Sequence, residues 1–293
     1  MSEPHHDTPD RDDARGRDHQ VAAAASGQRA ARACTTAPSK AILITFPPSL
    51  DCELSRFLLA HYRIPYEERR HTVIFSFFAT LWHGSTLNFP LLYGDSYRPL
   101  DTVRKMIDYF DPLCPKDRNL QLTGGDRERG EADWTAFNGK LGGATTAFAY
   151  FHLLPHRQIM IRPLTEGVPV YEVLAVRWAY PLFAGFLRRA LHLSASVAEE
   201  ALGQIRTAVQ NVDARLADGR QYLVGVSDMA FANALAPLVL PDEYASLLPS
   251  FAEMPPALRS VIEEIQSHPA GQFAFRIYRD HRGGVPLRAR SPS

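Results

Sequence analysis

The stretch Ala41-Ile42-Leu43-Ile44-Thr45-Phe46, followed by Pro47-Pro48-Ser49, decides the fold class of this chain. A continuous apolar run with β-branched residues is typical of a strand buried on both faces, in the middle of a mixed or parallel sheet. The prolines end that strand, apolar residues then recur at helical spacing, and residues 64–70 indicate a second strand near a sheet edge. This β-α-β order predicts a parallel strand pair.

The elements that follow extend the same unit. Residues 73–82 predict an apolar helix, and residues 87–93 predict a short strand with a hairpin return at 97–98. Residues 100–110 carry apolar side chains three to four positions apart and predict an amphipathic helix, which Pro112 ends. We therefore predict an α/β domain over residues 40–114.

Residues 115–130 are polar and glycine-rich, and we interpret them as a linker. Strand signals vanish after them, so residues 131–282 predict an all-helical domain. The predicted helices cover residues 131–154, 168–192 with an interruption near Pro181, 197–216, 229–239, 256–268 and 270–279.

Both ends of the chain differ from the rest. Residues 1–39 contain no aromatic residue, many charges and an alanine run, so they bury too little apolar surface to offset their ordering entropy. We predict a disordered tail there and a second tail over residues 283–293. The acidic residues among the first twenty argue against a transit peptide, and no signal peptide is visible.

Composition excludes several classes of protein. Thirty-two Lys and Arg residues balance thirty-two Asp and Glu residues among 293, so no basic footprint predicts nucleic-acid binding. Cys34, Cys52 and Cys114 are too few and scattered for a disulfide framework, which indicates a reducing, cytoplasmic location. No apolar run is long enough to span a membrane. The eleven His residues are dispersed and no metal motif is present, so we expect no metal.

The order of these elements, with the residues at their joints, resembles the glutathione S-transferase family. Three stretches carry the resemblance: residues 46–67, which hold the first strand, catalytic loop and first helix; residues 89–110; and residues 216–230, which hold a helical-domain motif. The resemblance implies a thioredoxin-like, glutathione-binding domain followed by an all-helical domain. It also implies glutathione as co-substrate, a small electrophile as second substrate and a homodimer.

Ser49 is the candidate catalytic residue. It lies between a buried strand and a helix, where a hydroxyl and the helix dipole favour deprotonation of a bound thiol. The resemblance gives this serine the role of activating glutathione. In serine-type members an arginine commonly follows five residues later, whereas this chain has Leu54. The alternative is that Ser49 only caps the helix, because serine is a favoured cap.

The resemblance also assigns the glutathione-binding residues. Pro90 matches the family's cis proline, and Phe89 before it would pair its backbone with the cysteinyl part of glutathione. Asp101 and Thr102 would hold the γ-glutamyl ammonium and carboxylate at a helix start. Counting back from Tyr109 instead places this pair one residue later, at Thr102 and Val103. Which two residues form the site therefore stays open. The alternative is an ordinary helix cap.

Cys52 lies three residues after Ser49. Thioredoxin-like proteins use this spacing for a redox pair of two cysteines, but here only the second position is a cysteine. Cys52 supports either a glutathione-dependent thiol reductase or a small buried core residue. Four aromatic residues are candidates for the acceptor pocket between the domains or for the core: Tyr150, Phe151, Trp178 and Tyr180.

The sequence thus predicts a glutathione transferase that adds the glutathione thiolate to a small electrophile. The alternatives are a non-catalytic binding or interaction protein of the same fold, and the thiol reductase.

The sequence departs from the family pattern at one place that concerns stability. The loop before Ser227 is short, and Gly225 replaces the capping hydroxyl expected three residues before Asp228. We therefore expect a shifted or less stable helix start there.

Overall fold

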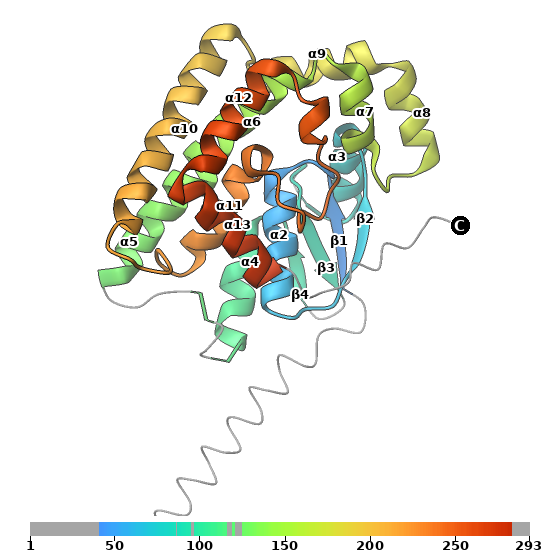
Figure 1. Cartoon of the computed structure of the whole chain (residues 1–293). Coiled ribbons are helices and arrows are strands. Elements are labelled where there is room, and N and C mark those ends of the chain that lie inside the picture. The colour runs from blue at the N-terminus through green and yellow to red at the C-terminus, as the bar shows by residue number, and fades with distance from the viewer. Residues whose placement is uncertain (1–40, 86, 95–96, 116–118, 121–124, 283–293) are drawn as a thin grey trace, which may run out of the picture.

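The fold is built outward from β1 (Ile42–Thr45), whose four residues are all buried. The computed structural model describes residues 41–85, 87–94, 97–115, 119–120 and 125–282 (Figure 1). The predicted tails at 1–39 and 283–293 lie outside these residues.

Four short strands form one mixed sheet in the order β2-β1-β3-β4. β2 (Glu67–Arg70) runs parallel to β1 at one edge, while β3 (Leu91–Gly94) runs antiparallel to β1 and β4 (Tyr97–Leu100) antiparallel to β3. The predicted parallel β-α-β unit and the hairpin return are confirmed. The helices of this part are α2 (Leu50–His61), α3 (Val73–Trp82) and α4 (Val103–Phe110), followed by a 3₁₀ turn at Asp111–Leu113.

The rest of the described chain is helical, as predicted (Figure 1). It contains α5 (Gly125–Trp134), a π-helical segment (Thr135–Leu141), α6 (Gly142–Leu153), α7 (Arg157–Thr165), α8 (Val170–Trp178), α9 (Tyr180–Ala190), α10 (Ala195–Leu216), α11 (Val226–Val239), a 3₁₀ turn (Phe251–Glu253), α12 (Pro256–Ser267) and α13 (Pro269–Arg282). None of the helices within the described ranges is long and apolar enough to cross a membrane.

Three details differ from the sequence-based expectation. Residues 125–130, assigned to the linker, form the first turns of α5, because Arg and Glu are good helix formers and Arg129 pairs with Asp126 one turn earlier (3.7 Å). The single predicted helix over 131–154 is instead interrupted by the π-helical segment. α7 was not predicted, because Pro163 inside it obscures the helical pattern.

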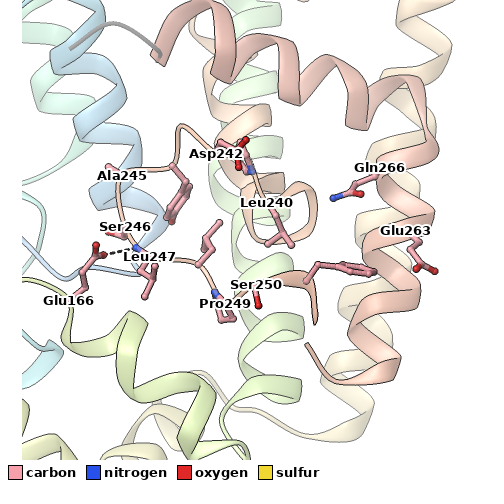
Figure 2. Close-up of a pocket in the computed structure, with 14 residues that line it drawn as sticks. Glu166, Leu240, Asp242, Ala245, Ser246, Leu247, Pro249, Ser250, Glu263 and Gln266 are labelled. Atoms are coloured by element: carbon pink, nitrogen blue, oxygen red, sulfur yellow. Dashed lines mark hydrogen bonds between the residues drawn. The ribbon is translucent and has the colours of Figure 1, made fainter. Parts of the chain in front are cut away.

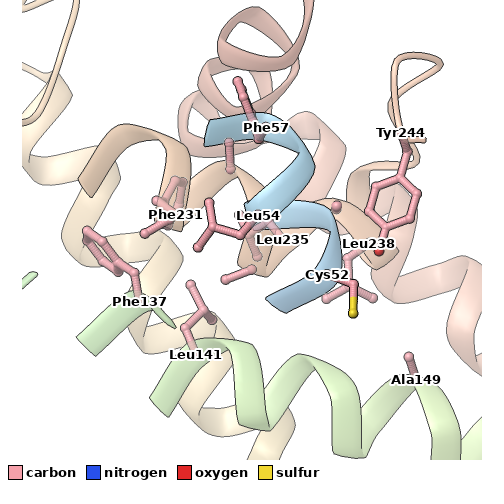
Figure 3. Close-up of a cluster of buried hydrophobic side chains, with 14 of the residues drawn as sticks. Cys52, Leu54, Phe57, Phe137, Leu141, Ala149, Phe231, Leu235, Leu238 and Tyr244 are labelled. Carbon is pink, nitrogen blue, oxygen red and sulfur yellow. The ribbon is translucent and has the colours of Figure 1, made fainter. Parts of the chain in front are cut away.

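The sheet unit and the helical bundle share one hydrophobic core. Figure 3 shows Leu54 and Phe57 of α2 among side chains of the π-helical segment and of α11, including Phe137 and Phe231. The rings of Phe137 and Phe231 meet edge to face at 5.1 Å. Because α2 belongs to both packing layers, its position relative to the bundle is fixed.

A buried charge cluster accompanies this apolar packing. Glu53 and Arg56 of α2 are fully buried. The Glu53 carboxylate accepts hydrogen bonds from Arg56 Nη1 and from Arg282 Nε of α13, both at 3.2 Å. Arg56 also pairs with Glu68 of β2 at 2.8 Å. Buried charges need such partners because an isolated one is costly.

We predict that Glu53→Ala lowers the free energy of unfolding by about 3–5 kcal/mol, because it leaves two buried guanidinium groups without their shared carboxylate. Urea unfolding measures this change. Glu199→Ala, at an exposed position of α10, is the matched control and should change stability by less than about 0.5 kcal/mol. Equal effects of the two substitutions would contradict the role given to the cluster.

The start of α11 shows how the short loop is accommodated. Gly225 is the N-cap residue with φ 53° and no side-chain cap, as the sequence indicates. A positive φ suits glycine. Asp228 turns back, and its Oδ1 accepts a hydrogen bond from the Leu223 N–H at 2.6 Å. Burial raises the pKa of Asp228 to about 6, against the opposing effect of this hydrogen bond.

Asp228 predicts a pH-dependent stability. Between its ordinary pKa of 3.8 and about 6, the folded chain holds a proton that the unfolded chain has released. The free energy of unfolding therefore falls as pH rises through this interval. Asp228→Asn keeps an acceptor for Leu223 and removes the titration. Relative to that variant, the wild type should lose roughly 2–3 kcal/mol across the interval in urea unfolding. A pH-independent difference would contradict the assignment.

Candidate functional site

Two adjoining cavities lie beside the N-terminal end of α2. The larger, about 450 Å³, lies between the sheet unit and α6 and α9, and we name it the apolar cleft. The smaller, about 310 Å³, lies beside the start of α4, and we name it the polar cavity. Asp51, Phe89 and Asn138 line both. A ligand that occupies one cavity can therefore extend into the other.

Ser49 lines the apolar cleft and is half-buried. It is the N-cap of α2, and its Oγ accepts a hydrogen bond from the Cys52 N–H at 3.4 Å. That long bond uses a lone pair of the hydroxyl and leaves its proton available to donate. The cap role is therefore present, and it does not conflict with donation to a bound thiolate. Leu54, where an arginine was expected, is fully buried in the core.

The peptide bond between Phe89 and Pro90 is cis, which confirms that prediction. The Phe89 ring lies between Phe46 (ring centroids 5.7 Å apart) and Phe77 (5.3 Å). Within the described part of the chain, neither the N–H nor the C=O of Phe89 forms a backbone hydrogen bond. These two groups, at the boundary of both cavities, are thus available to a ligand backbone.

Asp101 and Thr102 line the polar cavity together with Phe89 and Pro90. Thr102 is the N-cap of α4, and its Oγ1 accepts a hydrogen bond from Lys105 N at 3.2 Å. Asp101 Oδ1 accepts from Lys105 Nζ at 2.5 Å. Burial opposes ionisation of Asp101, but the Lys105 ammonium outweighs it and holds the pKa of this carboxyl below its ordinary value. The cavity is therefore polar, and the Asp101 carboxylate is already paired with Lys105.

The opposite wall of both cavities comes from a row of residues that sequence analysis missed. Its members stand four positions apart through α5, the π-helical segment and α6: Trp134, Asn138, Gly142, Thr146 and Tyr150. Residues with this spacing share one helix face. The signal was present, because counting back from Tyr150 in steps of four finds the row. π-helical turns often occur at functional sites.

Of the four predicted acceptor-pocket residues, only Tyr150 lines the apolar cleft. Phe151 is one position round the helix and packs against the core, and its ring contacts His152. Trp178 is 86% exposed at the end of α8, and Tyr180 is buried and donates to the Leu154 carbonyl at 2.8 Å. Aromatic character alone did not reveal which helix face each residue occupies.

No family model and no curated protein matches the sequence. Among solved structures, a glutathione S-transferase from Sinorhizobium meliloti is similar, with 17% identity, a TM-score of 0.50, and coverage of 85% of this chain and 97% of that one. A possible glutathione S-transferase from Rhodopseudomonas palustris is similar with 14% identity, a TM-score of 0.50, and coverage of 86% and 99%. This chain has the glutathione S-transferase fold. At such identities the likeness carries the fold, and the function must be argued from the site.

Cys52 lies in the core of this glutathione S-transferase fold and not in the cleft (Figure 3). It is fully buried, and the Phe46 N–H donates to its Sγ at 3.3 Å. Burial raises the pKa of the thiol to about 12, although Arg56 opposes the shift. Since the thiolate is the reactive form, this environment favours the core interpretation over the redox one.

We predict that Cys52 reacts with iodoacetamide at least about 100-fold more slowly in the folded chain than in the urea-unfolded chain, because alkylation needs an exposed thiolate. Mass spectrometry of the peptide that contains Cys52 follows the reaction. The unfolded chain is the internal control. Rapid and complete alkylation of the native protein would restore the reductase alternative.

A third cavity, about 700 Å³, lies away from these residues, between the loop after α11 and α12. Figure 2 shows Glu166 reaching this loop, where its carboxylate accepts from the Leu247 N–H at 2.5 Å. None of the sequence-predicted site residues lines it. Six of the predicted residues line the apolar cleft or the polar cavity instead: Ser49, Phe89, Pro90, Asp101, Thr102 and Tyr150.

Proposed function

We propose that the protein is a glutathione transferase that binds glutathione across the polar cavity and adds its thiolate to an apolar electrophile in the apolar cleft. The observation that carries the proposal is the meeting of the two cavities at Phe89 and Asp51, with Ser49 on the cleft side. An extended tripeptide along the cis-proline loop can reach both cavities. Its thiol then lies near the N-terminus of α2.

Ser49 is suited to activate that thiol. Its hydroxyl proton is not used by the cap, because the Oγ accepts from Cys52 N. Donation to a thiolate, together with the positive end of the α2 dipole, lowers the pKa of the bound thiol. The proton that leaves the thiol passes to water, and the thiolate sulfur then forms its bond to the electrophilic carbon. As that bond forms, the carbon's bond to a leaving group, or its π bond to the next atom, breaks; the electron pair leaves with the departing anion or takes a proton from water.

The polar cavity suits the γ-glutamyl end of glutathione. Thr102 and the free N–H groups at the start of α4 can receive its carboxylate. Asp101 can receive its ammonium, in competition with Lys105. This competition, with Leu54 in the arginine position, favours one alternative: a binding protein that keeps the fold without catalysis. The buried thiol of Cys52 gives no support to the reductase.

The cleft walls indicate the chemical class of the electrophile. Beside the polar Ser49, Asp51, Asn138 and Thr146, they include six large apolar side chains from the sheet unit, from α9 and from its C-cap: Phe46, Val73, Phe77, Phe186, Leu187 and Leu191. A cavity of this character binds by burial of apolar surface. We therefore place a small apolar electrophile there, and we keep the homodimer and the cytoplasmic location as parts of the proposal that follow from the family resemblance.

Isothermal titration of the full chain with glutathione tests the binding step. We expect a Kd between micromolar and millimolar, weakened about tenfold by Thr102→Ala, because the carboxylate loses a hydroxyl donor. Thr102→Ser keeps that donor and should restore affinity. If the folded protein shows no heat of binding at millimolar glutathione, the transferase proposal fails and the interaction-protein alternative replaces it.

The pKa of bound glutathione tests the chemical step. Ser49→Ala should raise it by about one unit or more, because the thiolate loses a donor, while affinity stays within about threefold. Asp51→Asn should lower it, because a carboxylate near the thiol disfavours a second negative charge. The ultraviolet absorbance of the thiolate against pH reports both shifts. Shifts of the same sign in the two variants would contradict this arrangement.

A further inference from the structure

α3 presents four large apolar side chains to solvent, Ile74, Phe78, Leu81 and Trp82, and two hydroxyl side chains to the interior. Ser76 and Thr80 are fully buried, whereas Phe78 is 65% exposed and Trp82 is 87% exposed. The buried hydroxyls are satisfied locally, by His71 O and Phe77 O, both at 3.1 Å. An ordinary surface helix has the reverse polarity. The outward stripe therefore points to something that covers it.

Further large apolar side chains are exposed on α8 and α9. Tyr171 and Trp178 of α8 and Leu182 and Phe186 of α9 are all exposed, with Trp178 at 86% and Leu182 at 78%. With Phe78 and Trp82 they form what we name the outer apolar surface. The ring of Tyr171 meets that of Phe75 of α3 at 5.7 Å, so the first turns of α3 and α8 are in contact. Figure 1 places α7, α8 and α9 at the periphery of the molecule.

The exposed charged side chains of α8 and α9 are all basic. Residues 155–193 contain five arginines and two glutamates, although the whole chain is neutral. Both glutamates are engaged elsewhere: Glu166 pairs with Arg70 at 3.1 Å, and Glu172 is fully buried against His71 at 2.7 Å. Arg177, Arg188 and Arg189 are exposed, and none of them forms a salt bridge with any residue that the structure describes.

We propose that the outer apolar surface docks the protein on an anionic lipid membrane. Tryptophan, leucine and phenylalanine on one face, bordered by unpaired arginines, are the features by which peripheral helices insert into the headgroup region. Each arginine adds attraction to an anionic leaflet. α3, α8 and α9 have 10, 9 and 11 residues, fewer than a bilayer-spanning helix needs, so the proposed attachment is to the membrane surface.

Charge also decides between the lipid and other occupants. A second copy bound through this surface in a two-fold dimer would bring the same arginines against each other, which is unfavourable. The N-terminal segment offers little to cover it, because residues 1–39 contain no Leu, Ile, Phe, Tyr or Trp. An anionic membrane complements both features of the surface: its headgroups attract the arginines, and its apolar interior accepts the apolar side chains.

Co-sedimentation of the full chain with vesicles tests the proposal. We expect binding to phosphatidylcholine vesicles with roughly 30% phosphatidylglycerol, and weaker binding to phosphatidylcholine alone or at high salt. Trp82→Ser/Trp178→Ser should weaken binding about tenfold or more. Arg188→Glu/Arg189→Glu should weaken binding to the anionic vesicles to a similar extent. In the wild type, tryptophan emission should shift to shorter wavelength on binding.

Two control pairs match these changes elsewhere on the surface. Tyr222→Ser/Phe251→Ser removes two other exposed aromatic side chains, and Arg127→Glu/Arg129→Glu reverses two exposed charges on α5. Both should leave vesicle binding within about twofold, and all variants should keep the thermal unfolding of the wild type. Absence of binding to anionic vesicles, or equal loss in test and control pairs, overturns the proposal. So does a dimer in solution that the tryptophan pair abolishes, because a second copy would then be the occupant.

Discussion

The rest of the structure depends on the pair of fully buried charges on α2, Glu53 and Arg56. Neither can remain unpaired without a large energetic penalty, so each recruits partners from distant parts of the chain. Glu68 comes from the sheet, Arg282 from the last described turn of α13, and the Ala245 N–H from the loop after α11. Arg56 also reaches the Pro47 carbonyl, two residues before Ser49. The network therefore holds α2, the loop that carries Ser49 and the helical bundle in one fixed arrangement, and the two cavities exist because that arrangement is fixed.

The sequence predicted those parts of the structure that local patterns determine. The apolar run at 41–46, the helix after it and the strand opened by Pro65 each follow from periodicity and proline chemistry, and they imply the mixed sheet. The cis peptide at Pro90 came from the family resemblance, and the cap at Thr102 was the alternative to the glutathione-binding role that the resemblance gives this residue; neither followed from periodicity. The wall formed by Asn138 and Tyr150 required knowledge of which face of a distorted helix meets the sheet. That depends on packing between segments about a hundred residues apart, which periodicity does not report.

Two residues show that competing interpretations of one side chain can be resolved by geometry. For Ser49 the cap and the activating role are compatible, because the cap uses a lone pair and activation uses the proton. For Cys52 the two roles exclude each other, because the burial that makes it a core residue also keeps its thiol protonated. The same helix terminus thus provides one group exposed to the cleft and one group withdrawn from it, and only the exposed group can take part in chemistry.

The places where local sequence rules and structure disagree are themselves informative. Most of the chain is locally consistent, with apolar faces turned inward, as a well-specified fold requires. α3 breaks that rule by burying Ser76 and Thr80 and exposing Phe78 and Trp82. The π-helical segment breaks the regular helix beside the cleft. α3 itself joins the two surfaces: Phe77 lines the apolar cleft, while the neighbouring Phe78 belongs to the outer apolar surface. Phe186 of α9 belongs to both. A layer that covers the outer apolar surface would therefore also lie at the edge of the apolar cleft.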